Sequence, residues 1–334
     1  MTNYLHKVLP PQYSHVNKVY CLLAATVFCA LPLCSTEAAA ENILKYDGTT
    51  NIHGNAKTWA AKNEYDGIDI RVTGVDGGYY TDTTEALVLN NQTLNVKGKG
   101  KFVSIINTAQ NKQIDNNGGI YAKGGSTVNF TDVDSIYIAA IAGKEGGNDS
   151  TVISAKDPGR DFKGYTNIVN ISGNTVQLIG SIDVMHSLGS VFFNRNARHT
   201  VNAALSGSDS FWYGSAIGET DERTTVNLSL ADGATWIFNA GKSTLNAGGI
   251  IRNLKLDKGV VLFADAEVWE TYRKTVIKGT DYVLANYRDH NERYSQVEIR
   301  SLTGPGGIFK MDLDWQSNNG ERQYTCLLYT SPSP

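Results

Sequence analysis

Four short boxes share one pattern: TVNF at residues 127–130, IVNI at 168–171, TVNA at 200–203 and TVNL at 225–228. Each box places an asparagine directly after a valine, and a second apolar segment follows each box along the chain. Apolar and polar residues alternate within the boxes, which is typical of a β-strand with one buried face. The recurrence therefore predicts a repeated unit of strand, turn and strand.

The spacing of the boxes bears on how these units are arranged. Their asparagines are separated by 41, 32 and 25 residues. Such unequal intervals do not fit a strict repeat motif, but a coiled parallel sheet accepts loops of different lengths between its turns. No amphipathic helical pattern occurs after Glu41. We therefore predict an all-β fold, a parallel β-helix. A β-sandwich, whose strands recur at about 8 to 12 residues, is the alternative, above all over residues 41–200.

The first 40 residues have the layout of a secretory signal. Lysines precede the apolar run CLLAATVFCALPLC at residues 21–34, and Ala38 and Ala40 follow in A-x-A spacing. The run is shorter than the roughly 20 residues that cross a bilayer. We therefore expect residues 1–40 to be a signal peptide for export through the Sec pathway, with cleavage after Ala40. A retained membrane anchor is the alternative.

Composition limits the classes of protein to consider. Three of the four cysteines lie in the predicted signal peptide, so only Cys326 remains and no disulfide scaffold is expected. A hydrophobic fraction of 41% is sufficient for a sizeable core instead. The formal net charge of −3 gives no general excess of Lys and Arg for a phosphate backbone, so nucleic acid is not an expected partner.

The strand pattern after residue 245 differs from that of the residues before it. Longer alternating strands such as NLKLDKGVVLF at 253–263 predict a β capping subdomain. Within LTGPGGIFKMDLDW at 302–315, the glycine-proline cluster predicts a turn, and the alternation after it predicts a strand. We therefore expect a hairpin between VEIRSL at 297–302 and the strand that begins near Phe309.

These C-terminal residues resemble a known family. NLKLDKGVVLF followed by VEIRSLTGPGGIFKMDLD is similar to the pertactin-like passenger and its junction in bacterial type V autotransporters. The family pattern is a leucine strand, a G-x-G-G turn and an alternating strand that ends in aspartate. The matching junction residues here are Gly304, Gly306, Gly307, Phe309 and Asp314.

The resemblance is specific over residues 245–315 and only compositional over 41–244. It implies a right-handed parallel β-helix with a C-terminal autochaperone-like region, located at the cell surface or outer membrane or released outside the cell. It also implies a partner, an outer-membrane β-barrel that follows the passenger in the same polypeptide.

The residue patterns and the resemblance together divide the chain into a signal peptide at 1–40, a β-helical body at 41–244, a capping region at 245–323 and a tail at 324–334. The tail ends in CLLYTSPSP, which lacks strand alternation and resembles a translated sequencing adapter. We therefore expect the reading frame to be truncated before the β-barrel. A natural tail rich in proline and serine is the alternative.

Several stretches contain residue types that occur in catalytic or metal-binding sites. GSDSF at 207–211 lacks the glycine after a serine that a nucleophile motif requires, so we predict a loop. A β-helical polysaccharide lyase or glycosidase would need paired carboxylates, and Asp132 with Asp134 forms one such pair. GGNDS at 146–150 is a single imperfect copy of a calcium-binding repeat.

A second pair of carboxylates, Asp157 and Asp161, flanks Arg160. Both pairs are more typical of turn-capping or solvated groups. We therefore predict no enzyme activity, no cofactor and no metal. A secreted carbohydrate-active enzyme is the alternative.

Candidate binding surfaces are easier to find. Lys97, Lys99 and Lys101 are expected on one side of a strand, where they would attract anionic glycans or solvate an exposed edge. FWY at 211–213 offers a sugar-stacking platform, although alternation predicts that one or two of the rings are buried.

The sequons at Asn129, Asn170 and Asn227 coincide with the boxes, so we interpret them as part of the strand pattern. The function predicted overall is that of an adhesin-like passenger. Its expected partners are host glycans or proteins on the surface of host or neighbouring cells.

Overall fold

The computed structural model describes residues 41–50, 60, 62–74, 84–109, 117–141, 151–156, 164–184, 196–218, 222–238, 248–263 and 296–310. By its internal contacts the chain divides after Ala40, and the described residues all belong to the second unit. The predicted cleavage site at Ala38 and Ala40 and the tail at 324–334 therefore lie outside them.

The regular structure of the described residues consists of strands. Their bounds are β1 (Ile43–Thr50), β2 (Gly67–Gly74), β3 (Thr84–Asn90), β4 (Thr93–Lys97), β5 (Phe102–Ala109), β6 (Asn117–Lys123), β7 (Thr127–Ile141), β8 (Thr151–Ala155), β9 (Thr166–Ile179), β10 (Ser181–Asp183), β11 (Arg198–Ser206), β12 (Phe211–Gly214), β13 (Ala216–Ile217), β14 (Thr224–Ala231), β15 (Thr235–Phe238), β16 (Gly248–Phe263) and β17 (Gln296–Lys310).

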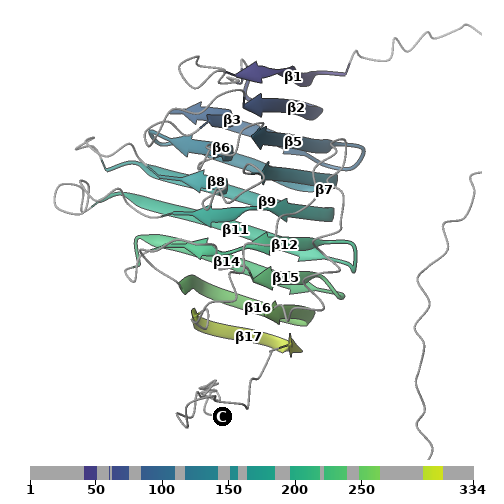
Figure 1. The fold of residues 1–334 in the computed structure, drawn as a ribbon, viewed down its shortest axis with the longest axis vertical. Coiled ribbons are helices and arrows are strands. Elements are labelled where there is room, and N and C mark those ends of the chain that lie inside the picture. The colour runs from purple at the N-terminus through teal and green to yellow at the C-terminus, as the bar shows by residue number, and fades with distance from the viewer. Residues whose placement is uncertain are drawn as a thin grey trace, which may run out of the picture. The chain divides into compact units, whose positions relative to one another are not determined.

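The strands form two sheets, and every pairing between described strands is parallel. The smaller sheet has the order β13-β10-β8-β6-β3, and the larger one runs from β1 to β17 (Figure 1). Parallel neighbours need crossover connections, whereas sandwiches are built from antiparallel strands. The prediction of an all-β fold with parallel strands is confirmed, and the sandwich alternative does not fit the pairing.

The longest strands bend, so that their two halves pair with different neighbours. In β7 the first half pairs with β4 and the second half with β5. In β16 the halves pair with β14 and β15 in the same way. Asp132 and Lys258 have φ angles of 58° and 60° at the two bends, where the registers shift. Each bend therefore turns the chain from one face of the stack to the next.

The four boxes lie side by side in one register. Each box asparagine is the direct partner of the next along β7, β9, β11 and β14. Two further strands join the row, because Asn129 pairs with Asn95 of β4 and Asn227 pairs with Asn253 of β16. The repeated unit predicted from the boxes is therefore confirmed, and the row is longer than the sequence indicated.

Alternation within each box separates the core from the outer face. In β7, Val128 and Phe130 are fully buried, while Thr127 and Asn129 are half-buried and point to the other side. The inward side chains of successive strands form one continuous apolar cluster. Burying a large apolar side chain contributes about 1.5–3 kcal/mol, so this cluster is the main source of stability.

Stacked tryptophans fill the core where β12 and β15 pair. The rings of Trp212 and Trp236 are 5.1 Å apart with an interplanar angle of 7°. Trp212 and Tyr213 are buried, and Phe211 is partly exposed. The prediction that alternation buries one or two of these three rings is confirmed, which removes two of them from any sugar-stacking platform.

The predicted hairpin at the C-terminal junction is wrong. Residues 296–310 form one strand, β17, which lies parallel to β16 along its whole length. Gly304 and Gly306 have φ angles of 107° and 138°, and a Cβ on Gly304 would lie 2.1 Å from the carbonyl oxygen of Leu256. The glycines therefore serve a bend and a close approach of two backbones, not a reversal of the chain.

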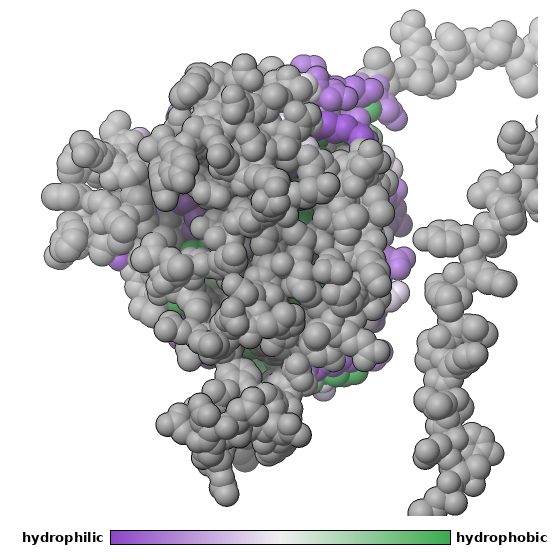
Figure 2. Space-filling view, viewed as in Figure 1, coloured by the Kyte–Doolittle hydropathy of each residue, from purple (hydrophilic) through white to green (hydrophobic). Residues whose placement is uncertain are grey.

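Apolar side chains are exposed at the β17 end of the stack. Figure 2 shows hydrophilic surface near the β1 end and a hydrophobic area at the β17 end. Leu302 and Ile308 of β17 are 40% and 52% exposed. Phe309, one of the junction residues, packs partly against the core, whereas Asp314 lies outside the described residues.

Candidate functional site

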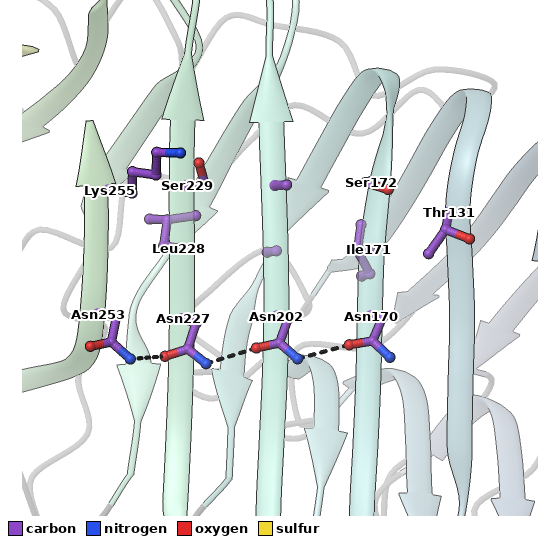
Figure 3. Close-up of a pocket in the computed structure, with 12 residues that line it drawn as sticks. Thr131, Asn170, Ile171, Ser172, Asn202, Asn227, Leu228, Ser229, Asn253 and Lys255 are labelled. Carbon is purple, nitrogen blue, oxygen red and sulfur yellow. Dashed lines mark hydrogen bonds between the residues drawn. The ribbon is translucent and has the colours of Figure 1, made fainter. Parts of the chain in front are cut away.

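A ladder of asparagine side chains runs across the outer face of the large sheet. Each side-chain Nδ2 donates to the Oδ1 of the asparagine on the neighbouring strand that precedes it. Figure 3 shows the part of this ladder from Asn170 to Asn253. The five N–O distances are Asn129–Asn95 2.9 Å, Asn170–Asn129 2.8 Å, Asn202–Asn170 2.7 Å, Asn227–Asn202 2.7 Å and Asn253–Asn227 2.6 Å.

The ladder follows from register and alternation together. Because the strands are parallel and in register, equivalent side chains stand one strand spacing apart, about 4.8 Å. A short amide side chain spans this gap with one donor and one acceptor, so all the amides are aligned in one direction. At the first strand Asn95 Nδ2 donates to the backbone oxygen of Asn63 at 3.2 Å. Each internal asparagine retains a second N–H and a second lone pair.

A second outward row borders the ladder, two residues further along each strand. From β7 to β16 its members are Thr131, Ser172, Ala204, Ser229 and Lys255. Between this row and the ladder lies a groove of about 330 Å³, which is at the small end of the range for ligand sites. The groove therefore joins amide groups, hydroxyls and one ammonium group on one face.

Two features of the second row shape the groove. Ala204 is exposed and lies between Ser172 and Ser229, so the row has a methyl group in place of a hydroxyl at this strand. Lys255 extends from β16 toward Ser229 and borders one end of the groove (Figure 3). The hydroxyl oxygen of Ser172 accepts a hydrogen bond from the backbone N–H of Asp132 at 3.2 Å, and its own O–H remains a donor.

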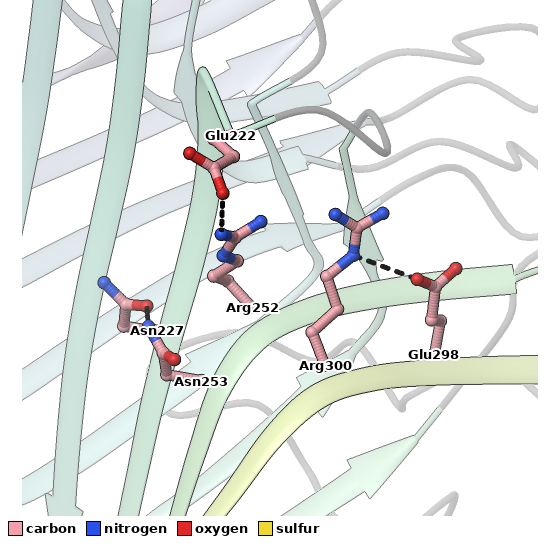
Figure 4. Close-up of polar contacts among 6 residues, drawn as sticks. All are labelled: Glu222, Asn227, Arg252, Asn253, Glu298 and Arg300. Carbon is pink, nitrogen blue, oxygen red and sulfur yellow. Dashed lines mark hydrogen bonds and ion pairs between the residues drawn. The ribbon is translucent and has the colours of Figure 1, made fainter.

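Among the described residues, Lys255 differs from the nearby arginines in having no ion-pair partner. Figure 4 shows that Arg252 pairs with Glu222 at 2.7 Å and Arg300 with Glu298 at 2.9 Å. No carboxylate of the described residues forms an ion pair with Lys255. Its ammonium group is therefore the charge in the groove that an acidic ligand would meet.

The sequons have a structural explanation. In each, the asparagine belongs to the ladder, the next residue is buried, and the Ser or Thr belongs to the second row. Asn129, Asn170 and Asn227 all use their amides within the ladder. This geometry supports the interpretation of the sequons as a strand pattern.

The three predicted lysines do not share a strand face. Lys97 ends β4, Lys99 lies in the turn that follows, and Lys101 forms an ion pair with Asp66. The glycines between them bend the chain, since Gly98 and Gly100 have φ angles of 96° and 77°. The prediction of a three-lysine face was wrong because it assumed that alternation continued through this turn.

The ion pair of Asp66 predicts an acid dependence. The Lys101 ammonium, together with the backbone N–H of Asn42, lowers the pKa of Asp66 below its ordinary value of 3.8. The stabilisation is therefore present at neutral pH and is lost as the pH falls through the lowered pKa. We expect carboxyl-detected NMR to give a pKa below 3.8 in the native chain and a higher pKa in Lys101→Met. An equal pKa in both proteins would contradict this assignment.

Two of the candidate residues within the described part of the chain, Asp134 and Ser210, serve turns. Asp134 accepts hydrogen bonds from the backbone N–H of Gly100 at 3.0 Å and from Asn174 Nδ2 at 3.3 Å. In GSDSF, Ser210 is buried, and its hydroxyl donates to the backbone oxygen of Ser206 at 2.6 Å and accepts from the N–H of Val176 at 3.0 Å. These contacts fit the turn and loop interpretations of both stretches.

Other predicted sites lie outside the described residues. They are Asp157, Arg160, Asp161 and GGNDS at 146–150. Within the described residues, no group of three or more His, Cys, Asp or Glu side chains is arranged to hold a metal ion. The part of the chain that the structure describes also contains no helix capable of crossing a membrane.

No protein-family model, curated protein or solved structure matches the chain.

Proposed function

We propose that the chain is an adhesin-like passenger of the autotransporter type, a β-helical protein that binds ligands at the cell surface or outside the cell without catalysis. The observation that carries this proposal is the unbroken asparagine ladder with its bordering groove. The similarity of residues 245–315 to the junction of such passengers supports the same assignment.

The β-helix is the arrangement that best accounts for the pairing. Along the chain, β6 of the small sheet is followed by the two halves of β7, and each of these segments pairs with the equivalent segment of the next unit. Parallel β-crossovers are right-handed in the great majority of proteins, which supports a right-handed coil. In this proposal β16 and β17 add the last described rungs.

A binding role fits the outer face better than catalysis does. Repeated equivalent groups along a stack favour many weak contacts to an extended or multivalent partner. The enzyme alternative needs two carboxylates held about 5 to 9.5 Å apart across a substrate. The groove lining contains no Asp or Glu, and the Asp134 carboxylate is occupied by turn hydrogen bonds.

The proposal is tested by measuring adhesion directly. The purified chain, labelled on its amines at low stoichiometry, is incubated with cultured epithelial cells and with bacterial cells. Saturable binding that unlabelled chain displaces is expected. Binding that neither saturates nor is displaced on either cell type would contradict an adhesin-like function.

Export predicts a defined cleavage site. Because signal peptidase needs small residues at the two A-x-A positions, the chain produced in a bacterial host is expected to begin at Glu41. Replacing Ala38 and Ala40 together by leucine is expected to leave residues 1–40 attached. Mass spectrometry of the product distinguishes the two results. A native product that retains Met1 would contradict the signal peptide.

A further inference from the structure

We propose that the groove beside the asparagine ladder binds an extended glycan that carries carboxylate groups, with the sugar chain lying across β9, β11, β14 and β16. This inference rests on the proposed function and adds to it the site and the class of ligand. It depends on three features of the groove: the repeat distance, the hydrogen-bonding groups and the position of one positive charge.

The repeat distance suits a glycan. Ladder amides recur once per strand, about every 4.8 Å, in a direction perpendicular to the strands. A sugar unit in a β-1,4-linked chain has nearly the same length, so successive sugars meet equivalent amides. Each internal asparagine offers one donor and one acceptor beyond the ladder, which matches the dual character of a sugar hydroxyl.

The second row adds specificity within this repeat. Ser172 and Ser229 provide hydroxyls on either side of Ala204, whose exposed methyl group offers an apolar contact to the C–H face of one sugar. At the end of the groove Lys255 supplies a charge without a carboxylate partner among the described residues. A carboxylate on the sugar chain is the group that would complete this arrangement, since charge-assisted hydrogen bonds are the strong ones.

Other classes of ligand fit the groove less well. A peptide that adds a strand needs the unpaired edge of a sheet, whereas this groove lies on a sheet face whose backbone groups are already paired. A single-stranded nucleic acid needs aromatic platforms and a basic channel, and the lining has no aromatic residue and one lysine.

The test compares two glycans of different charge on the full chain. Isothermal titration calorimetry is carried out with a hyaluronan oligosaccharide, which has a carboxylate on every second sugar, and with neutral cellohexaose. We expect the native chain to bind the hyaluronan fragment more tightly. Lys255→Met is expected to weaken that binding about tenfold, as loss of one charge-assisted contact implies, and to weaken cellohexaose binding by a smaller factor.

A second variant tests the position of the sugar chain. Ala204→Tyr places a large ring in the groove on a residue type that favours strands, so the fold is expected to be retained while binding of both glycans falls by at least about tenfold. Lys99→Met, on the turn outside the groove, is the matched control and is expected to bind as the native chain does. Circular dichroism verifies that each variant is folded.

The outcomes separate this inference from the proposed function. Glycan binding that neither Lys255→Met nor Ala204→Tyr alters would overturn the groove as the site. Failure of the folded native chain to bind either glycan would overturn the ligand class. In both cases, displaceable adhesion of the native chain to cells would still support the proposed function. If the native chain showed no such adhesion, the proposed function itself would be contradicted.

Discussion

Replacement of Trp236 by alanine is expected to lower the free energy of unfolding by about 3–5 kcal/mol, the range for removing a large ring from a packed core. The ring is fully buried, stacks on Trp212, and meets Phe238 edge-on at 5.6 Å. Its Nε1 donates to the carbonyl oxygen of Gly214 at 3.0 Å. The substitution therefore leaves a cavity and an acceptor without its donor.

Urea unfolding followed by far-ultraviolet circular dichroism measures this loss. Trp236→Phe is the matched control, because it keeps an aromatic ring in the stack and removes the indole N–H. Its loss of unfolding free energy is expected to be smaller. Leaving the buried carbonyl of Gly214 without its donor costs about 1–3 kcal/mol, and the phenyl ring is only somewhat smaller than the indole. Equal stability of the alanine variant and the native chain would show that this ring is not in the core.

Gly304→Ala is expected to detach β17 from β16. The added Cβ would meet the backbone of Leu256 at 2.1 Å, and the φ angle of 107° is one that alanine rarely adopts. Backbone strain of this kind costs about 1–3 kcal/mol, and the steric clash adds to it. Because β17 is the last described strand, we expect local release of residues 296–310 and not global unfolding.

Hydrogen exchange read by mass spectrometry locates the effect. Peptides from β17 are expected to lose protection in Gly304→Ala, while peptides from β9 and β11 keep it. Gly306→Ala is the control, since a Cβ there meets no atom within 4 Å and only the φ angle of 138° is strained. The loss of protection in β17 is expected to be smaller in Gly306→Ala than in Gly304→Ala. Unchanged protection of β17 in Gly304→Ala would contradict the close approach of the two strands.

Much of the strand pattern could be predicted from the sequence, because alternation is a local property. The boxes at 127–130, 168–171, 200–203 and 225–228 all form strands, with the valine inward and the asparagine outward. The burial of Trp212 also followed from alternation. Each of these predictions needed only the residue and its immediate neighbours.

Contacts between strands could not be predicted in the same way. Asn95 and Asn253 belong to the ladder, but the first follows leucine and the second follows arginine, so neither matches the Val-Asn pair. The Gly304–Gly307 cluster reads locally as a reversing turn, and its actual role depends on the backbone of β16. In both cases the role of the residues depends on the register between neighbouring strands.

The lining of the groove could not be predicted from the sequence either. Its lining comes from five strands spread over residues 131–255, and nothing in the spacing of Ser172, Ala204 and Lys255 indicates that they share a row. The loops between the strands differ in length, so only the pairing aligns these residues. The tripeptide pattern of the sequons was the one signal in the sequence for two adjacent outward polar rows.

The central claim is that equivalent residues stand on successive parallel strands at one strand spacing. Pulsed electron–electron resonance between spin labels tests it, with Cys21, Cys29, Cys34 and Cys326 replaced by serine. One label is placed at Lys97 of β4 and the second in turn at Ser229, Lys255 or Thr303, which occupy equivalent positions on β14, β16 and β17.

The three label pairs span four, five and six strand spacings, so the backbone separations are about 19, 24 and 29 Å. We expect the measured distance to rise by about 4.8 Å from each pair to the next. Distances that do not increase in this order, or that stay constant among the three pairs, would contradict the stacked parallel arrangement from which the ladder and the groove both follow.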